Sequence, residues 1–152
     1  MLAIIRPNEW ELPLFIHVLG ALAVVGGLTF ATAMLFSAWR DRSAPNVRLA
    51  LRSLTLGVLP AFVVLRGSAE WIADKEGYAD LDEPPDWIEI GYIVADAGFL
   101  LILIPTLLAW AALGKARADI RPGATVTIAA VLISLALVAN LIALWAMTTR
   151  PG

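Results

Sequence analysis

The chain has 152 residues, 60% of them hydrophobic, and a mean hydropathy of +0.80. These values exclude an ordinary water-soluble domain and are typical of a chain that lies mostly in a lipid bilayer. It has no cysteine and a single histidine, His17, which excludes disulfides, thiolate metal centres and a bis-histidine site within one chain. The formal net charge of −2 says little by itself, because acidic and basic residues lie in different loops.

Four long apolar runs predict an all-α, polytopic membrane protein that folds as one four-helix transmembrane bundle over residues 1–152. A helix rises about 1.5 Å per residue, so each run is long enough to cross a hydrocarbon layer of about 30 Å. We expect the first run to be retained rather than cleaved as a signal peptide, because an acidic flank precedes it and it is too long. The expected helices cover residues 12–39, 47–73, 87–113 and 124–148.

Prolines are expected to shape these helices. Pro45, together with Asn46, is expected to break the chain between the first two helices. Pro60 and Pro105 lie inside the second and third helices, where the missing N–H is expected to produce kinks. Such kinks either widen a cavity or only shape the packing.

The charged loops predict the orientation in the membrane. The turns after the first and third helices, with the start of the second helix, hold seven of the eleven basic residues, whereas the connection 74–86 is strongly acidic. The positive-inside rule therefore places both basic turns in the cytoplasm and both termini outside. Tryptophans near the outer helix ends fit the same orientation. The basic residues are Arg40, Arg42, Arg48, Arg52, Lys115, Arg117 and Arg121, and the outer tryptophans are Trp10, Trp71, Trp87 and Trp145.

Polar residues inside the four predicted helices are expected to share one depth, in the outer half of the bilayer. Every helix contributes at least one of them, and all should lie within about one or two helical turns of each other. Ionisable residues are costly in lipid and normally face the bundle interior or a water-filled cavity, so this polar layer is the candidate binding site. Its members are His17, Arg66, Glu70, Asp96 and Asn140, with Tyr92 on the same helical face as Asp96.

Each member of the polar layer also has a purely structural interpretation. Arg66 is spaced i, i+4 from Glu70, and it can pair with Glu70 or with Asp96 to hold helices together. Asn140 is expected to hydrogen-bond between helices, and His17 alone could bond a neighbour or reach the headgroups. Small residues on the His17 face of the first helix allow either close helix packing or room for a flat ligand. They lie at Gly20, Ala21, Val24, Gly27 and Ala31.

The segment LFIHVLGA at residues 14–21, followed by Val25-Gly26-Gly27, resembles the first helix of two groups of small bacterial membrane proteins. These are the integral membrane proteins related to the copper-resistance D type and the HemJ-type protoporphyrinogen oxidases. In both, a histidine lies early in an inward-running first helix and is followed by small residues. The HemJ resemblance implies a haem-associated four-helix bundle of the bacterial cytoplasmic membrane with His17 as iron ligand. The other resemblance implies copper handling.

Three functions remain open from the sequence. The leading hypothesis is an integral membrane binding or redox module that holds a cofactor or small ligand at the polar layer, with haem as the first cofactor to consider. His17 would then be the metal ligand, Arg66 the partner of a propionate or another anion, and the nearby carboxylates would handle protons or balance charge. The alternative is a small transport or channel subunit that relays protons or a cation along Glu89, Asp96, Glu70 and His17. The third is a structural or accessory subunit of a homo-oligomer or a larger membrane complex.

Overall fold

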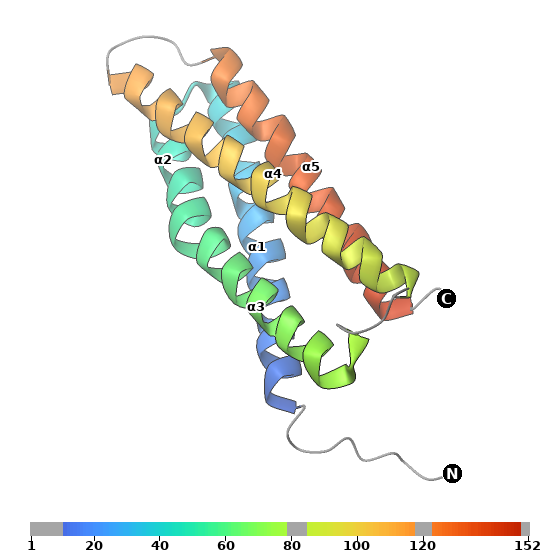
Figure 1. Ribbon diagram of the computed structural model, residues 1–152. Coiled ribbons are helices and arrows are strands. Elements are labelled where there is room, and N and C mark those ends of the chain that lie inside the picture. The colour runs from blue at the N-terminus through green and yellow to red at the C-terminus, as the bar shows by residue number, and fades with distance from the viewer. Residues whose placement is uncertain (1–10, 79–84, 118–122, 150–152) are drawn as a thin grey trace.

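The computed structural model of the protein describes residues 11–78, 85–117 and 123–149 (Figure 1). Its elements are α1 (Glu11–Asp41), α2 (Ala44–Arg52), η2 (Ser53–Val58), α3 (Leu59–Glu76), α4 (Asp86–Arg117) and α5 (Gly123–Thr149), where η2 is a π-helical turn. Because α2, η2 and α3 follow each other without interruption, they form one long helix. The described residues thus contain four helices long and apolar enough to span a membrane. The predicted all-α, four-helix bundle of a multi-pass membrane protein is confirmed.

The helix boundaries differ from the predicted ones by a few residues, most clearly at the start of the second helix. α2 begins at Ala44, so Pro45 and Asn46 lie inside the helix, and the expectation that they break the chain is wrong. A proline fits the first turn of a helix because its fixed φ is helical and its missing N–H would have no partner there. α4 also continues to Arg117, beyond its predicted end at Leu113.

The connection between α1 and α2 reverses the chain within Arg42 and Ser43. Arg42 has a φ of 52°, in the left-handed region. The Ser43 N–H donates to the Ala38 carbonyl at 3.3 Å. This hydrogen bond is that of a Schellman motif, which closes the last turn of a helix and usually has glycine at the left-handed position.

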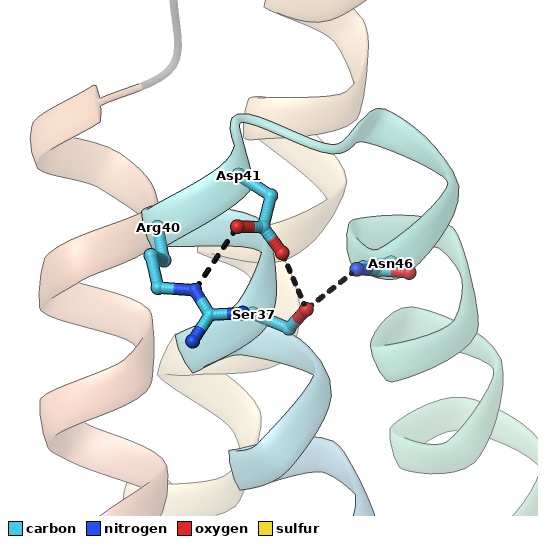
Figure 2. A network of polar contacts seen from close by, with 4 residues as sticks. All are labelled: Ser37, Arg40, Asp41 and Asn46. Atoms are coloured by element: carbon cyan, nitrogen blue, oxygen red, sulfur yellow. Dashed lines mark hydrogen bonds and ion pairs between the residues drawn. The ribbon is translucent and has the colours of Figure 1, made fainter.

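Side-chain hydrogen bonds also connect the two helices at this turn, as Figure 2 shows. Asn46 Nδ2 donates to Ser37 Oγ at 2.9 Å, and Ser37 Oγ donates to Asp41 Oδ2 at 3.2 Å. Arg40 Nε donates to the other oxygen of the same carboxylate, Asp41 Oδ1, at 3.0 Å. The network ties the end of α1 to the start of α2 and engages both carboxylate oxygens of Asp41.

The middle of the second span departs from regular α-helical hydrogen bonding. The Leu59 N–H donates to the Leu54 carbonyl five residues back, which is the π-helical pattern. Pro60 follows directly and has no N–H to donate to the Leu56 carbonyl four residues back. The irregularity expected at Pro60 therefore takes the form of a π-helical turn just before it. Pro105, by contrast, is buried within the continuous helix α4.

The packed core lies at the end of the bundle where α1 meets α2 and α4 ends, which we call the inner half. Buried apolar side chains from every helix meet here, and many of them are alanines, which let helix backbones approach closely. The core residues are Val24, Leu28, Ala31, Leu35, Ala38, Val47, Ala50, Leu54, Val58, Phe62, Ile102, Ala109, Ala112, Leu113, Val126, Ala129, Ala130, Ile133 and Ala136. This packing fixes the arrangement of the four spans.

The opposite end, where α1 and α4 begin and α3 and α5 end, is the outer half. Here α4 stays packed along α5 and α1 along α3, but α3 diverges from α4 and touches it at few positions (Figure 1). Two aromatic pairs bridge the divergence. The Phe62 and Phe99 ring centroids are 6.3 Å apart, and Tyr78 meets Trp87 edge to face at 5.7 Å. We call this sparse contact between α3 and α4 the outer seam.

Large apolar side chains cover the outside of the bundle. Every span exposes several of them, which is the surface expected against lipid tails rather than water. Examples at half exposure or more are Leu22, Leu56, Val63, Trp110 and Leu135.

Candidate functional site

Four of the predicted site residues meet at the outer seam, and we call them the Arg66 cluster. Arg66 Nη2 lies 2.9 Å from Glu70 Oε1 on the same helix and 3.5 Å from Asp96 Oδ1 across the seam on α4. The Tyr92 hydroxyl donates to Glu70 Oε2 at 3.3 Å. The Arg66 guanidinium also sits over the Tyr92 ring, 4.8 Å from its centroid. The i, i+4 pairing predicted for Arg66 and Glu70 is confirmed, and so is the pairing with Asp96.

The Arg66 cluster has one more carboxylate than it has cations. With all three groups ionised, Arg66, Glu70 and Asp96 carry a net charge of −1. The side chains are also open, because Arg66 is 33%, Glu70 50% and Asp96 75% exposed. A net negative charge near lipid is costly, a few kcal/mol or more, unless it is neutralised. A proton or a bound cation would supply the missing positive charge.

The depth of the Arg66 cluster follows from the helix lengths. Arg66 lies ten residues before the end of α3 at Glu76, and Asp96 lies ten residues after the start of α4 at Asp86. Both are therefore about 15 Å from the outer helix ends. Spans of 33 and 32 residues are about 50 Å long and extend about 10 Å beyond a centred hydrocarbon layer on each side. The cluster then lies about 5 Å inside the outer edge of that layer.

His17 has a partner of its own, Ser68, which the sequence analysis did not single out. His17 Nδ1 lies 3.3 Å from Ser68 Oγ on α3. Ser68 is almost fully buried, and its hydroxyl proton goes to the Leu65 carbonyl at 2.9 Å. With the serine proton on the Leu65 carbonyl, Ser68 Oγ would act as the acceptor for a protonated Nδ1 of His17. His17 also hydrogen-bonds the Leu65 backbone, so the ring has two partners on α3.

The five-residue polar layer is not one connected network. Among the described residues, no hydrogen bond or ion pair joins His17 to the Arg66 cluster. Asn140 is buried on α5, but its Nδ2 donates to the Ala136 carbonyl of its own helix at 2.9 Å. Instead of the expected bond between helices, the Asn140 amide thus donates to a carbonyl one turn back in its own helix.

Close packing, rather than a flat ligand, fills the small-residue face of α1. A methyl group built on Gly20 would lie 3.2 Å from the Leu65 backbone of α3. A methyl group on Gly27 would lie 2.6 Å from Val58. Val24 and Ala31 on the same face are fully buried. Residues of α3 and η2 thus fill the space beside Gly20 and Gly27 that a flat ligand would need.

The mouth of the outer seam is acidic. Asp74 and Glu76 lie at the end of α3, and Asp86 and Glu89 lie at the start of α4, against the single basic residue Lys75. Surface charges of one sign raise the local concentration of the opposite ion. The predicted site residues and this mouth together favour a cationic ligand over an anionic one.

Trp10 and Arg121, which the sequence analysis used for the orientation, lie outside the described residues, as do residues 79–84 of the acidic connection 74–86. Within the described ranges, no group of three or more histidine, cysteine or acidic side chains is arranged to hold a metal ion.

Comparison with known proteins does not place this chain in a family. No family model, no curated protein and no solved structure matches it. The resemblance of the first helix to the copper-resistance D and HemJ types therefore stays a prediction.

Proposed function

We propose that this protein is a membrane binding module that takes a proton or a small monovalent cation into the Arg66 cluster from the outer side. The observation that carries the proposal is the net charge of −1 on an open cluster near the edge of the hydrocarbon layer. Glu70 and Asp96 would hold the cation, while Arg66 keeps the two carboxylates close together. The acidic mouth supports the choice of a cation, because it would attract one and repel an anion.

The packed inner half supports binding rather than conduction through one copy. On the inner side of the seam, Phe62 lies one turn from Arg66 and Ile102 lies six residues beyond Asp96, and both are buried in the apolar core. An ion entering from the outer side would meet mainly these apolar side chains, besides the buried hydroxyls of Thr32 and Thr106. The transport hypothesis would therefore require a second copy or another subunit to complete a path, in keeping with the predicted homo-oligomer or larger complex.

The test compares carboxylates inside and outside the cluster in the full-length protein, reconstituted in lipid nanodiscs. Infrared difference spectra are recorded on adding Na⁺ at fixed pH, and separately on lowering the pH. We expect carboxyl signals that disappear in Glu70→Gln and in Asp96→Asn. The matched controls are Glu76→Gln on the same helix as Glu70 and Asp86→Asn on the same helix as Asp96. Difference spectra that are the same in all four variants would contradict the proposal.

Haem is the second candidate, and one observation favours it. His17 Nδ1 lies within hydrogen-bond distance of Ser68 Oγ, and a metal-ligating histidine is normally oriented by such a partner at one ring nitrogen while the other binds the metal. Two other observations do not fit: Gly20 is covered by Leu65, and Arg66 already has two carboxylate partners instead of being free for a propionate. We therefore derive no reaction step through haem.

An absorption spectrum decides the haem hypothesis. The protein is purified in detergent from haem-replete cells and compared with His17→Ala and with the matched polar variant Ser68→Ala. A Soret band that is lost in His17→Ala and shifted in Ser68→Ala would support haem binding. A colourless protein would remove the hypothesis and leave the cation proposal in place.

The location follows from the same reasoning. We infer that the protein lies in the bacterial cytoplasmic membrane with the outer seam facing away from the cytoplasm. The basic residues at the inner half support this orientation. The bacterial assignment is supported only by the resemblance of the first helix.

A further inference from the structure

A second site lies at the other end of the bundle, in a groove between the second span and α4. The groove has a volume of about 560 Å³. Its lining comes from α2 and η2 on one side and from α4 on the other, next to the π-helical turn and Pro105. The lining residues are Arg48, Leu51, Arg52, Thr55, Thr106, Leu107, Trp110 and Leu113.

Two arginines give the groove its charge. Arg48 and Arg52 are spaced i, i+4, so they lie one turn apart on the same face of α2. Within the described part of the chain, neither has a carboxylate within 4.0 Å. The nearby Asp41 is already engaged by Arg40 and Ser37, as Figure 2 shows. The groove therefore carries two positive charges that no described side chain neutralises.

The two threonine hydroxyls in the groove lining already have acceptors for their protons. Thr55 Oγ1 donates to the Leu51 carbonyl at 2.8 Å, and Thr106 Oγ1 donates to the Ile102 carbonyl at 2.7 Å. Both hydroxyls thus direct their protons back into their own helices. The guanidinium groups are the donors left to meet a ligand, and their planar fork matches the oxygens of a phosphate.

Apart from the two arginines and the two threonines, the groove lining is apolar, and it lies at the depth of lipid. Arg48 and Arg52 lie four and eight residues from the start of α2, which places them about 6 and 12 Å along the helix. Leu107 and Trp110 continue the lining on α4, and they are 56% and 69% exposed. A ligand that fits must therefore place a phosphate near the helix end and a hydrocarbon chain beside α4.

We propose that this groove binds an anionic glycerophospholipid of the inner leaflet. Its phosphate would bind Arg48 and Arg52, and one acyl chain would lie along Leu107 and Trp110. Basic pockets between transmembrane helices are suited to anionic headgroups. The contrast with Arg66 supports the choice, because Arg66 is neutralised by two carboxylates whereas Arg48 and Arg52 are left for an external anion.

The first experiment counts bound lipids by native mass spectrometry of the full-length protein in detergent. Phosphatidylglycerol is titrated against phosphatidylcholine with the same acyl chains. We expect one tightly bound phosphatidylglycerol and an affinity at least about tenfold weaker in Arg48→Gln/Arg52→Gln. The control Arg42→Gln/Lys115→Gln removes two charges from the same end of the bundle but outside the groove lining. Equal losses in the two double variants, or no preference for phosphatidylglycerol, would overturn the proposal.

A second pair of variants tests the groove with both arginines in place. Leu107→Trp fills part of the groove, whereas Ile104→Trp places the same side chain on α4 outside the lining, and both positions are exposed. We expect Leu107→Trp alone to weaken phosphatidylglycerol binding. Inorganic phosphate at the concentration of the lipid should not displace it, because the acyl chain supplies part of the affinity. Identical binding by the two variants, or displacement by phosphate, would refute a lipid site.

Discussion

The inner and outer halves of the bundle are held together by different kinds of contact between helices. In the inner half, apolar side chains from all four spans fill the axis, and its arginines point to the surface. In the outer half, α3 diverges from α4, and the two are joined across the seam by aromatic pairs and the Arg66 cluster. Apolar packing joins all four spans in the inner half, whereas aromatic and polar contacts join α3 and α4 in the outer half, where we propose that a cation binds.

The difference has a physical cause in the sequence of the spans. In the outer half, α3 and α4 carry Arg66, Glu70 and Asp96, which cannot pack as closely as the alanines of the inner half. The hydrophobic effect does not drive α3 and α4 together in a bilayer, because lipid tails are as apolar as leucine. The inner half should therefore be sensitive to side-chain volume and the outer half to charge.

The largest effect is expected from removing volume in the inner core. Leu28→Ala leaves a cavity at a fully buried position, whereas Leu22→Ala removes the same atoms from a side chain of the same helix that is 64% exposed. We expect Leu28→Ala to lower the free energy of unfolding in bicelles by about 2–3 kcal/mol and Leu22→Ala to lower it by less than about 0.5 kcal/mol. Similar losses would show that the inner half is not packed as described.

Removing the positive charge of Arg66 should lower the free energy of unfolding by less than the core substitution does, because the Arg66 cluster is partly exposed. Arg66→Gln leaves Glu70 and Asp96 without their shared partner, and we expect a loss of about 1–2 kcal/mol in the free energy of unfolding. The triple variant Arg66→Gln/Glu70→Gln/Asp96→Asn removes the unpaired charges as well and should recover most of that loss. A triple variant that is less stable than Arg66→Gln alone would show that charge is not what the seam responds to.

Alanine substitutions at two glycines of α1 distinguish the effect of close packing on stability from that of helix propensity. Gly20→Ala would press a methyl group against the Leu65 backbone, which cannot move aside easily, and we expect a loss of about 1 kcal/mol. Gly26 has nothing within 4 Å of the new methyl group, so Gly26→Ala should be neutral or stabilising by up to about 1 kcal/mol. Thermal unfolding of the two variants in the same detergent measures the contrast, and effects of the same sign would contradict it.

The smallest effect is expected at the inner turn. Arg42 holds a left-handed backbone conformation that glycine adopts without strain. Arg42→Gly should raise stability by a few tenths of a kcal/mol, up to about 1 kcal/mol, since the freer unfolded chain offsets part of the relief. Arg40→Gly, inside the last turn of α1, is the control and should lower stability. A destabilised Arg42→Gly would mean that the arginine side chain contributes more than its backbone costs.

The sequence predicts the fold well because a transmembrane span is a local property. Length and hydrophobicity alone identify the four helices, and the i, i+4 spacing alone pairs Arg66 with Glu70. The start of the second helix is misplaced because Pro45 signals a break in general but fits the first turn of a helix. Such an error changes a boundary and leaves the bundle unchanged.

The candidate site is less predictable, because its contacts depend on how helices are rotated and separated. Depth along each span brings His17, Arg66 and Asn140 into one layer, but it does not say which way each residue faces. Ser68 is marked in the sequence only as a small polar residue two positions after Arg66. Its contact with His17 forms only because α1 packs on α3, which the sequence does not specify. The π-helical turn and the groove beside it likewise depend on tertiary structure.

The most direct test asks whether the outer seam admits cations from the outer side. The chain has no cysteine, so Ala69→Cys on α3, one turn from Arg66, introduces the only thiol. Leu141→Cys on α5 is the lipid-facing control. It lies at a similar depth, because Leu141 is eight residues from the end of α5 and Ala69 is seven residues from the end of α3. Both are treated in oriented vesicles with membrane-impermeant thiol reagents of opposite charge. We predict that Ala69→Cys reacts from the outer side, and faster with the cationic reagent, while Leu141→Cys stays protected. Equal protection of both thiols, or faster reaction with the anionic reagent, would contradict an open, cation-selective seam.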